Sequence, residues 1–203
     1  MMWEFVYLAS GSPRRRALLQ QIGVPFQVLG VEVDERPGPD EAALGYVTRV
    51  AAAKAAAGWL QSCRKAPANS PVLAADTAVV LDGRILGKPA HRRDALDMLR
   101  LLSGRTHEVL TGIAVVTERG VESRHSRSEV TFRAISDLEA GAYWDTGEPC
   151  DKAGAYAIQG RAAIFVANLR GSFSGVMGLP LYETADLLAK AGVPRWQQQA
   201  EQG

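Results

Sequence analysis

The sequence predicts an α/β protein built on a mixed sheet, with two lobes around a cleft. Segments with apolar residues at helical spacing alternate with short apolar, strand-like segments along the whole chain. The 203 residues are 47% hydrophobic, enough to form a sizeable core in one domain or one bilobed domain. Breaks rich in glycine and proline separate the halves, so we expect one bilobed domain over 1–203 with a mobile tail from about 193.

The first predicted unit is a strand, a turn of small residues and a helix. Residues 5–8 form a short apolar run, and residues 17–22 have apolar positions at helical spacing. Ser12 suits the helix N-cap, and Pro13 suits the first helical position because its missing N–H is not needed there. The free N–H groups of a helix start attract anions, so the turn predicts a phosphate-binding loop.

Three arginines, Arg14, Arg15 and Arg16, follow this turn directly. Cations in the first turn oppose the helix dipole, so local helix energetics do not explain them. An anion bound in front of the turn would explain them. An ordinary strand, turn and helix with solvated arginines is the alternative.

An acidic pair follows the second predicted strand, which covers residues 26–29. Asp34 and Glu35 offer the oxygen ligands that a hard divalent cation prefers, although a solvated loop fits them equally. Asp40 is then expected to cap an alanine-rich helix that runs to about residue 60.

Lys54 lies on the inward stripe of that helix, in register with Val47, Val50 and Ala51. The spacing predicts a lysine directed at the interior. A lysine that snorkels past the helix edge is the alternative.

Asp76 interrupts the apolar strand predicted over residues 72–81, and Asp82-Gly83 then predicts a hairpin turn with a return over 84–86. A carboxylate within an apolar strand is costly to bury unless it is paired or binds a metal. Asp76 is therefore predicted to be a metal ligand or a base for water. Pairing with a backbone N–H or a nearby arginine is the alternative.

The remaining elements are predicted from apolar periodicity and from cap signals such as the capping box that begins at Ser136. They are a helix with Ala95, Met98, Leu99 and Leu102 on one face that stops at Gly104, helices over about 136–147 and 179–192, and strands over 106–117, 128–132 and 162–169.

Two further side chains are candidates for ligand binding. Lys88 follows the hairpin and could contact phosphate oxygens, and Gln159 offers both a donor and an acceptor to a base. Exposed, solvated side chains are the alternative for both. Asp151-Lys152 is a weaker ionic candidate, and His107 is interpreted as structural.

Composition excludes several classes of function. A net charge of +1 argues against broad electrostatic binding of nucleic acid. Cys63 and Cys150 match no metal-ligand spacing and suit reduced thiols. No apolar run is long enough to span a membrane, and the start of the chain shows no secretory signal, so a cytoplasmic location is expected.

Several cations and carboxylates without a nucleophilic cysteine or serine arrangement indicate metal-assisted hydrolysis of a phosphoanhydride. Six blocks of the chain also resemble, in order, the motifs of the Maf family of nucleoside triphosphate pyrophosphatases. They are Leu8-Ala-Ser-Gly-Ser-Pro-Arg-Arg-Arg16, Ala75-Asp-Thr77, Leu86-Gly-Lys-Pro89, Leu102-Ser-Gly-Arg-Thr-His107, Asp151-Lys-Ala-Gly-Ala-Tyr-Ala-Ile-Gln-Gly160 and Val176-Met-Gly-Leu-Pro180.

The resemblance implies an elongated α/β fold related to inosine triphosphatase, with a deep cleft between two lobes. It implies hydrolysis of dTTP or UTP to the monophosphate and pyrophosphate with Mg²⁺, Mn²⁺ or Co²⁺. It leaves the oligomeric state open, with a homodimer as one arrangement. A nucleotide-binding regulator of cell division, in which catalysis is dispensable, is the alternative function.

The resemblance also assigns roles to residues. Asp76 falls on the position of the proposed proton acceptor, and Asp34 is favoured over Glu35 as its partner in holding the metal. The positions that bind phosphate are Ser10, Arg14, Arg15, Lys54 and Lys88. The positions that set specificity in the dTTP/UTP branch are Arg14, Thr77 and Gln159.

Overall fold

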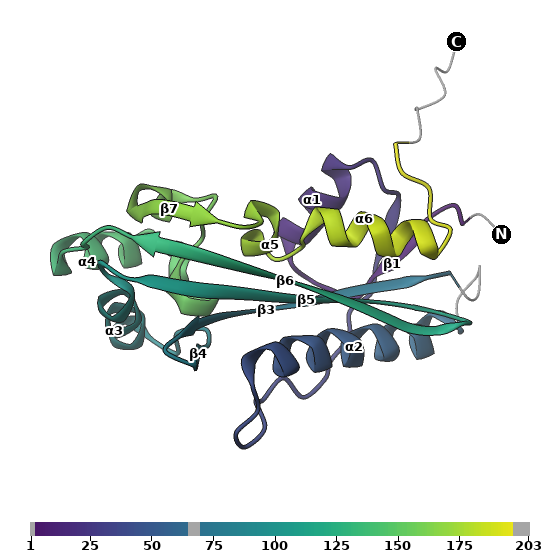
Figure 1. Ribbon diagram of the computed structural model, residues 1–203, viewed down its shortest axis with the longest axis horizontal. Coiled ribbons are helices and arrows are strands. Elements are labelled where there is room, and N and C mark those ends of the chain that lie inside the picture. The colour runs from purple at the N-terminus through teal and green to yellow at the C-terminus, as the bar shows by residue number, and fades with distance from the viewer. Residues whose placement is uncertain (1–2, 65–69, 197–203) are drawn as a thin grey trace, which may run out of the picture.

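The computed structural model describes residues 3–64 and 70–196 and has the predicted α/β architecture. Within these residues one seven-stranded mixed sheet is flanked by helices, and the molecule is elongated along its central strands (Figure 1). The expected elongated, mixed fold is confirmed.

The sheet has the order β2-β1-β3-β5-β6-β7, with β4 paired to β3. Strands β1, β2 and β3 are parallel, and all other pairs are antiparallel. The strands are β1 (Val6–Leu8), β2 (Phe26–Val28), β3 (Val72–Leu81), β4 (Arg84–Leu86), β5 (Thr106–Thr117), β6 (Gly120–Phe132) and β7 (Val166–Arg170).

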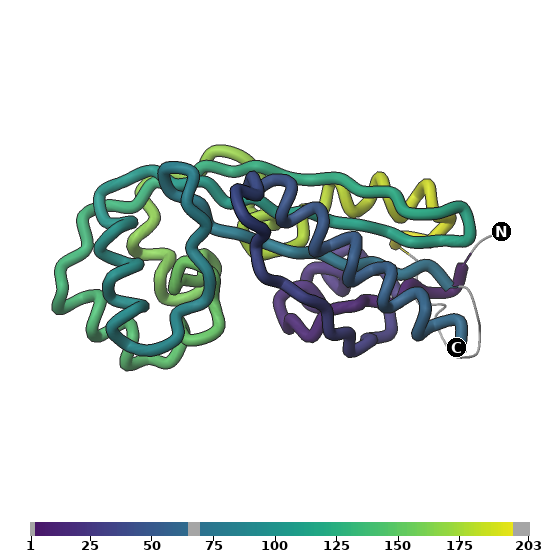
Figure 2. Tube along the Cα trace, turned by 90° about the horizontal axis from the view of Figure 1, so that it is seen from below, coloured from purple at the N-terminus to yellow at the C-terminus, as the bar shows by residue number. Residues whose placement is uncertain are grey.

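Helices cover the two ends of the sheet differently. Helix α2 packs on one face of the sheet and α1 and α6 on the other, whereas α3 and α4 lie at the opposite end (Figures 1 and 2). The helices are α1 (Pro13–Gln21), α2 (Ala43–Ser62), α3 (Arg92–Leu102), α4 (Asp137–Asp145), α5 (Phe173–Met177) and α6 (Leu181–Lys190), and the 3₁₀ turns are η1 (Glu148–Asp151), η2 (Ala153–Ala155) and η3 (Arg161–Phe165).

No helix among the described residues is long and apolar enough to cross a membrane.

The apolar core is divided between these two ends. One cluster joins α3 and α4 with the start of β5 and the end of β6. It includes the buried side chains of Leu99, Phe132 and Phe165. Other clusters lie on the two faces of the sheet beneath α1, α2 and α6. Met177 packs against the first cluster and against the one beneath α1 and α6, so it lies where the two ends meet.

Two glycines allow helix α2 to lie close to the sheet. A Cβ added at Gly112 would approach the carbonyl oxygen of Val47 to 2.5 Å, and one at Gly58 would approach Val72 Cγ1 to 2.8 Å. Gly112 is the direct partner of Asp76 across the β3–β5 pair. The close approach of α2 therefore occurs where Lys54 must reach Asp76.

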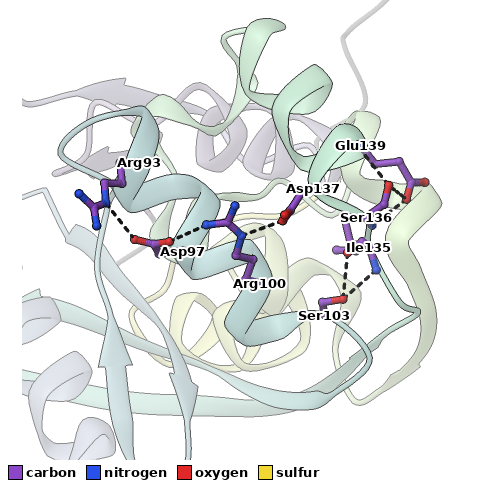
Figure 3. Close-up of polar contacts among 8 residues, drawn as sticks. All are labelled: Arg93, Asp97, Arg100, Ser103, Ile135, Ser136, Asp137 and Glu139. Atoms are coloured by element: carbon purple, nitrogen blue, oxygen red, sulfur yellow. Dashed lines mark hydrogen bonds and ion pairs between the residues drawn. The ribbon is translucent and has the colours of Figure 1, made fainter.

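Polar contacts tie α3 to α4 at the other end (Figure 3). The Arg100 guanidinium donates to Asp97 Oδ1 at 2.9 Å on its own helix and to Asp137 Oδ1 at 2.7 Å on α4. The predicted capping box is present, with Ser136 and Glu139 exchanging hydrogen bonds at the start of α4. The Arg100 contacts join the two helices at their exposed side, while Leu99, Ala140 and Tyr143 pack in the buried first cluster.

Some predicted boundaries are wrong. Asp40 does not cap α2, because it lies in a turn with φ of 52° and the N-cap is Ala42. Strand β6 begins at Gly120 rather than 128, because pairing with β5 continues through its polar half. Antiparallel pairing with a buried neighbour here outweighs a sequence without clear alternation.

The region after residue 161 also differs from the prediction. Residues 161–165 form the turn η3 before β7 starts, and the glycine-rich stretch contains the short helix α5. In the expected tail, Val193 is buried and its N–H donates to the carbonyl of Leu188, while residues 197–203 lie outside the described residues.

Candidate active site

A cleft of about 770 Å³ lies between the two ends of the molecule. It is lined by the loop after β1, the start of α1, the inner face of α2, strand β3, the β4 arm and the segments 151–159 and 176–178. Eight of the predicted site residues line it: Ser10, Arg14, Arg15, Lys54, Asp76, Thr77, Lys88 and Gln159. The ninth, Asp34, does not line the cleft.

Two carboxylates share one ammonium group at the centre of this cleft. Lys54 Nζ lies 2.8 Å from Asp76 Oδ1 and 2.8 Å from Glu35 Oε1. Asp76 and Lys54 are buried, with 6% and 9% of their surface exposed. The predicted inward lysine and the buried aspartate therefore pair with each other, as buried charges require.

Burial raises the pKa of Asp76, because desolvation disfavours the charged form. The positive charges of Lys54 and Arg15 oppose this rise, and the charge of Glu35 adds to it. The carboxylate is thus a stronger base than an ordinary aspartate. Its Oδ1 atom is engaged by Lys54, and no described residue donates a hydrogen bond to Oδ2.

The preference for Asp34 over Glu35 is not supported by the geometry. Asp34 is turned outward, where it accepts hydrogen bonds from the backbone N–H and the guanidinium of Arg36 at 3.0 and 2.7 Å. Hydrogen bonds from Arg36 hold the pKa of Asp34 well below its usual range. Because this local turn captures Asp34, its neighbour Glu35 is the carboxylate that faces Lys54 and the cleft.

Arg15 connects three parts of the cleft wall. Its guanidinium donates to the Gly178 carbonyl at 2.8 Å, to Ser10 Oγ at 3.1 Å and to Thr77 Oγ1 at 3.4 Å. Burial lowers the pKa of Arg15 and the charge of Asp76 opposes that shift, yet an arginine remains a cation at any physiological pH. The side chain therefore braces the wall and supplies positive charge.

The turn before α1 is organised by Ser10 instead of by the N-cap residue. Ser12 occupies the N-cap position as predicted, but its side chain makes no capping hydrogen bond. The Ser12 N–H donates to Ser10 Oγ at 3.3 Å instead. Ser10 thus holds the loop and Arg15 together at the helix start.

Thr77 is held from behind by a chain of hydroxyl groups. Thr111 donates to the Gly175 carbonyl at 2.8 Å, so the 2.9 Å contact between the two threonines has Thr77 as the donor. Gly178, with φ of 115°, closes the α5–α6 turn against Arg15 and Thr77, because a Cβ there would lie 3.4 Å from both side chains. Gly178 belongs to the block Val176-Met-Gly-Leu-Pro180 that the sequence singles out.

The facing wall carries side chains that lack protein partners. Lys88 and Gln159 are exposed and make no hydrogen bond or ion pair with the described parts of the chain. Arg14, on the α1 side, makes a single long contact of 3.4 Å to the Met177 carbonyl. Burial lowers the pKa of Arg14, and the nearby carboxylates of Asp151 and Glu148 oppose that shift.

Sequence reasoning missed or undervalued other lining residues. Tyr46 on α2 lines the cleft, and burial raises its pKa to about 12. Lys152 forms an ion pair with Asp151 at the rim. A lone tyrosine in an alanine-rich helix carries no sequence signal, so its place in the cleft follows from packing alone.

His107 lies outside the lining and has the surroundings of a structural residue. It is buried, its Nε2 lies 2.8 Å from the Tyr156 hydroxyl, and its ring packs edge-on against Phe132. Desolvation lowers its pKa to about 4, so the ring is neutral at physiological pH.

Comparison with known proteins gives consistent matches along most of the chain. A family model described as Maf-like protein matches residues 5–191. A dTTP/UTP pyrophosphatase from Methylococcus capsulatus is 58% identical over 92% of this chain and 90% of its own length. One from Alkalilimnicola ehrlichii is 55% identical over 90% of this chain and 91% of its own.

A third relative and one solved structure match at lower similarity. A dTTP/UTP pyrophosphatase from Aromatoleum aromaticum is 50% identical over 93% of this chain and 96% of its own length. The structure of the Staphylococcus aureus Ham1 protein aligns with 66% of this chain and 73% of its own, at 16% identity and a TM-score of 0.41.

Proposed function

The chain belongs to the Maf-like protein family, and we propose that it is a pyrophosphatase that hydrolyses dTTP and UTP to the monophosphate and pyrophosphate. Relatives 50–58% identical over most of the chain carry the name dTTP/UTP pyrophosphatase. The observation that carries the proposal is the buried Asp76–Lys54 pair, joined at its exposed side by Glu35, in a cleft that is also lined by Arg14 and Lys88.

The cations of the cleft suit a triphosphate. Arg14 and Lys88 line the cleft and have donors that no described residue engages, so they can both engage phosphate oxygens. Lys54 and Arg15 lie deeper and are already ordered by protein groups. Ordered positive charge stabilises the charge that develops on a leaving pyrophosphate without reorganisation.

Asp76 is proposed as the proton acceptor. Its Oδ2 atom accepts no hydrogen bond from the described residues, and its raised pKa lets it orient and deprotonate a water better than an exposed aspartate could. Water then attacks the α-phosphorus in line with the bond that breaks. The new P–O bond forms on the monophosphate, and the electron pair of the broken bond leaves with pyrophosphate.

Asp76 and Glu35 fit a divalent cation, because both carboxylates already converge on one positive charge, the Lys54 ammonium. Among the described residues no cluster of three or more acidic, histidine or cysteine side chains exists, so the other ligands would be waters and phosphate oxygens, as is usual for Mg²⁺. When bound, the cation would screen phosphate charge and lower the pKa of water. Mg²⁺, Mn²⁺ and Co²⁺ are the ions to compare.

The test is hydrolysis in ¹⁸O-labelled water with a panel of nucleoside triphosphates. The proposal expects dTTP and UTP to be preferred, with equal amounts of monophosphate and pyrophosphate released. It expects the label in the monophosphate, because attack is at the α-phosphorus. Label in pyrophosphate would refute the mechanism, and release of orthophosphate would refute the reaction.

Other features belong to the same proposal. We treat the chain as one bilobed domain that acts on a free nucleotide in the cytoplasm, with no nucleic acid or membrane partner. A homodimer is an arrangement that sedimentation can test.

A further inference from the structure

The segment that carries Gln159 is held from behind by one carboxylate, that of Glu148. Glu148 Oε2 accepts from the Arg161 N–H at 3.0 Å, and Oε1 accepts from the Ala162 N–H at 3.4 Å. Both donors belong to the start of the turn η3, directly after Gln159 and Gly160. Glu148 therefore fixes the C-terminal side of the loop that presents Gln159.

Tyr143 fixes the N-terminal side of the same loop. Its hydroxyl donates to Glu148 Oε1 at 2.7 Å and accepts from the Ala157 N–H at 3.2 Å. Tyr143 is buried on α4, which packs against α3 in the first apolar cluster and also contacts it through Arg100 and Asp137 (Figure 3). The loop is thus clamped through backbone N–H groups on both sides of an unpartnered Gln159 side chain.

Gly160 shows how closely the clamp is fitted. A Cβ built at this position would collide with both carboxylate oxygens of Glu148. Its φ of −104° is available to any residue, so backbone conformation does not explain the glycine. Only the proximity of the Glu148 carboxylate does.

The groups that face Glu148 here are all donors, so the site requires an acceptor. Burial opposes ionisation, but the N–H groups of Arg161 and Ala162 and the Tyr143 hydroxyl outweigh it and hold the pKa of Glu148 below its ordinary value. A glutamine of the same shape would turn an NH₂ group toward a donor. One of the three hydrogen bonds would therefore be lost and replaced by a repulsive contact.

We propose that Glu148 and Tyr143 are positioning residues that set base recognition, by holding residues 157–162 so that Gln159 faces the base of the bound nucleotide. This inference rests on the proposed function. Neither side chain lines the cleft, so both act through the loop and not by contact with the nucleotide.

The experiment uses the full chain with Glu148→Gln and compares two ligands that occupy different parts of the cleft. Binding of UMP, which carries the base, and of pyrophosphate, which does not, is measured by titration calorimetry. We expect UMP to bind about tenfold more weakly and pyrophosphate to bind at least as tightly as to wild type, because the lost hydrogen bonds lie behind Gln159 and the negative charge that is removed lies near the Arg14 cation. We expect the preference for UTP over GTP in kcat/KM to fall by a similar factor.

Gly160→Ala is the matched variant, because its methyl group displaces the Glu148 carboxylate without removing it. We expect the same pattern of ligand binding. The double variant should lose no more UMP affinity than the more affected single variant, since both substitutions disrupt the same contact between Glu148 and the loop. Glu129→Gln, on β6 and paired with Arg170, is the control for loss of one charge and should bind UMP as wild type does.

Hydrogen exchange of the peptide 156–162 supplies a second readout and should be faster in both loop variants. Faster exchange with unchanged UMP binding would overturn the inference, because the loop would then be loosened without consequence for the base. Tyr143→Phe, which removes one hydroxyl, replaces Glu148→Gln if that variant does not fold. UMP binding and hydrogen exchange test the positioning role of Glu148 without any measurement of hydrolysis. A failure of the proposed pyrophosphatase activity can therefore be distinguished from a failure of this inference.

Discussion

The two walls of the cleft hold their functional side chains in opposite ways. On the wall formed by β1, α1, α2 and β3, the charged groups of Arg15, Lys54 and Asp76 are bound to protein groups. On the facing wall, Lys88 and Gln159 make no polar contact with the part of the chain that the structure describes, while the backbone behind Gln159 is clamped. The first wall is ordered in its side chains, and the second is ordered in its backbone.

The difference follows from burial. A charge removed from water must be paired, so the catalytic groups are organised before any substrate arrives. An exposed side chain has no such requirement, and it is ordered only when a ligand supplies the contact. Chemistry is therefore expected to depend on protein-internal contacts and base preference on the placement of a loop. Five substitutions test this contrast, beginning with the largest expected effect.

Asp76→Asn should lower kcat by at least about 10³-fold, because an amide cannot accept the proton of the attacking water. Binding of UMP should remain measurable, since Arg14 and Lys88 are untouched. Steady-state kinetics with dTTP and UTP measure the effect. Asp34→Asn is the matched control and should retain nearly full activity, because Asp34 pairs only with Arg36 outside the cleft. Equal losses in both variants would contradict the placement of Asp76 as the base.

Lys54→Met should lower the free energy of unfolding at neutral pH by about 3 kcal/mol, because it leaves two carboxylates without their shared cation. It should also shift the pH profile. Activity needs ionised Asp76, whose pKa is raised, so kcat/KM falls as pH drops through that pKa. Without Lys54 the pKa rises further, and the acid limb should move to higher pH.

The raised pKa of Asp76 also predicts how the free energy of unfolding of the Lys54→Met variant depends on pH. A carboxyl with a folded-state pKa above its unfolded value stabilises the protein below the unfolded value, and that contribution is lost as pH rises through the folded pKa. The variant should therefore be closest to wild type in acid and furthest from it at neutral pH. Denaturant unfolding across pH measures this, and a pH-independent difference would argue against burial as the cause.

Arg15→Lys and Arg14→Lys separate bracing from ligand contact. Arg15 holds groups on three segments that a lysine cannot hold together, so Arg15→Lys should lower both thermal stability and kcat, the latter by about tenfold or more. Arg14 makes one long protein contact, so Arg14→Lys should raise KM several-fold and leave the unfolding temperature unchanged. Identical stability losses in the two variants would contradict the bracing role of Arg15.

Gln159→Ala should have the smallest effect on the protein itself. It should leave stability and pyrophosphate binding unchanged, because the side chain has no partner among the described residues, and it should reduce the preference for UTP over GTP by about tenfold. Competition assays with the two nucleotides measure this. Gln21→Ala, an exposed change at the end of α1, is the matched control. A preserved preference would show that other groups recognise the base.

Local sequence signals were sufficient to predict most helices and strands and to identify the main site residues. The capping box at Ser136 and the Asp82-Gly83 hairpin depend on neighbours within a few residues, so the sequence was sufficient to place them. The apolar stripe of α2 indicated that Lys54 faces inward. The interrupted strand indicated that Asp76 needs a partner, without identifying it.

Only the tertiary structure decided which neighbouring side chain enters the cleft and what holds it there. Asp34 and Glu35 are equivalent in sequence, and the choice between them depends on a turn at Arg36 and on a lysine one helix away. The bracing by Arg15 and the Glu148 clamp join segments that are distant in sequence or that lack local periodicity. Such contacts arise from packing of whole elements, and local propensity carries no information about them.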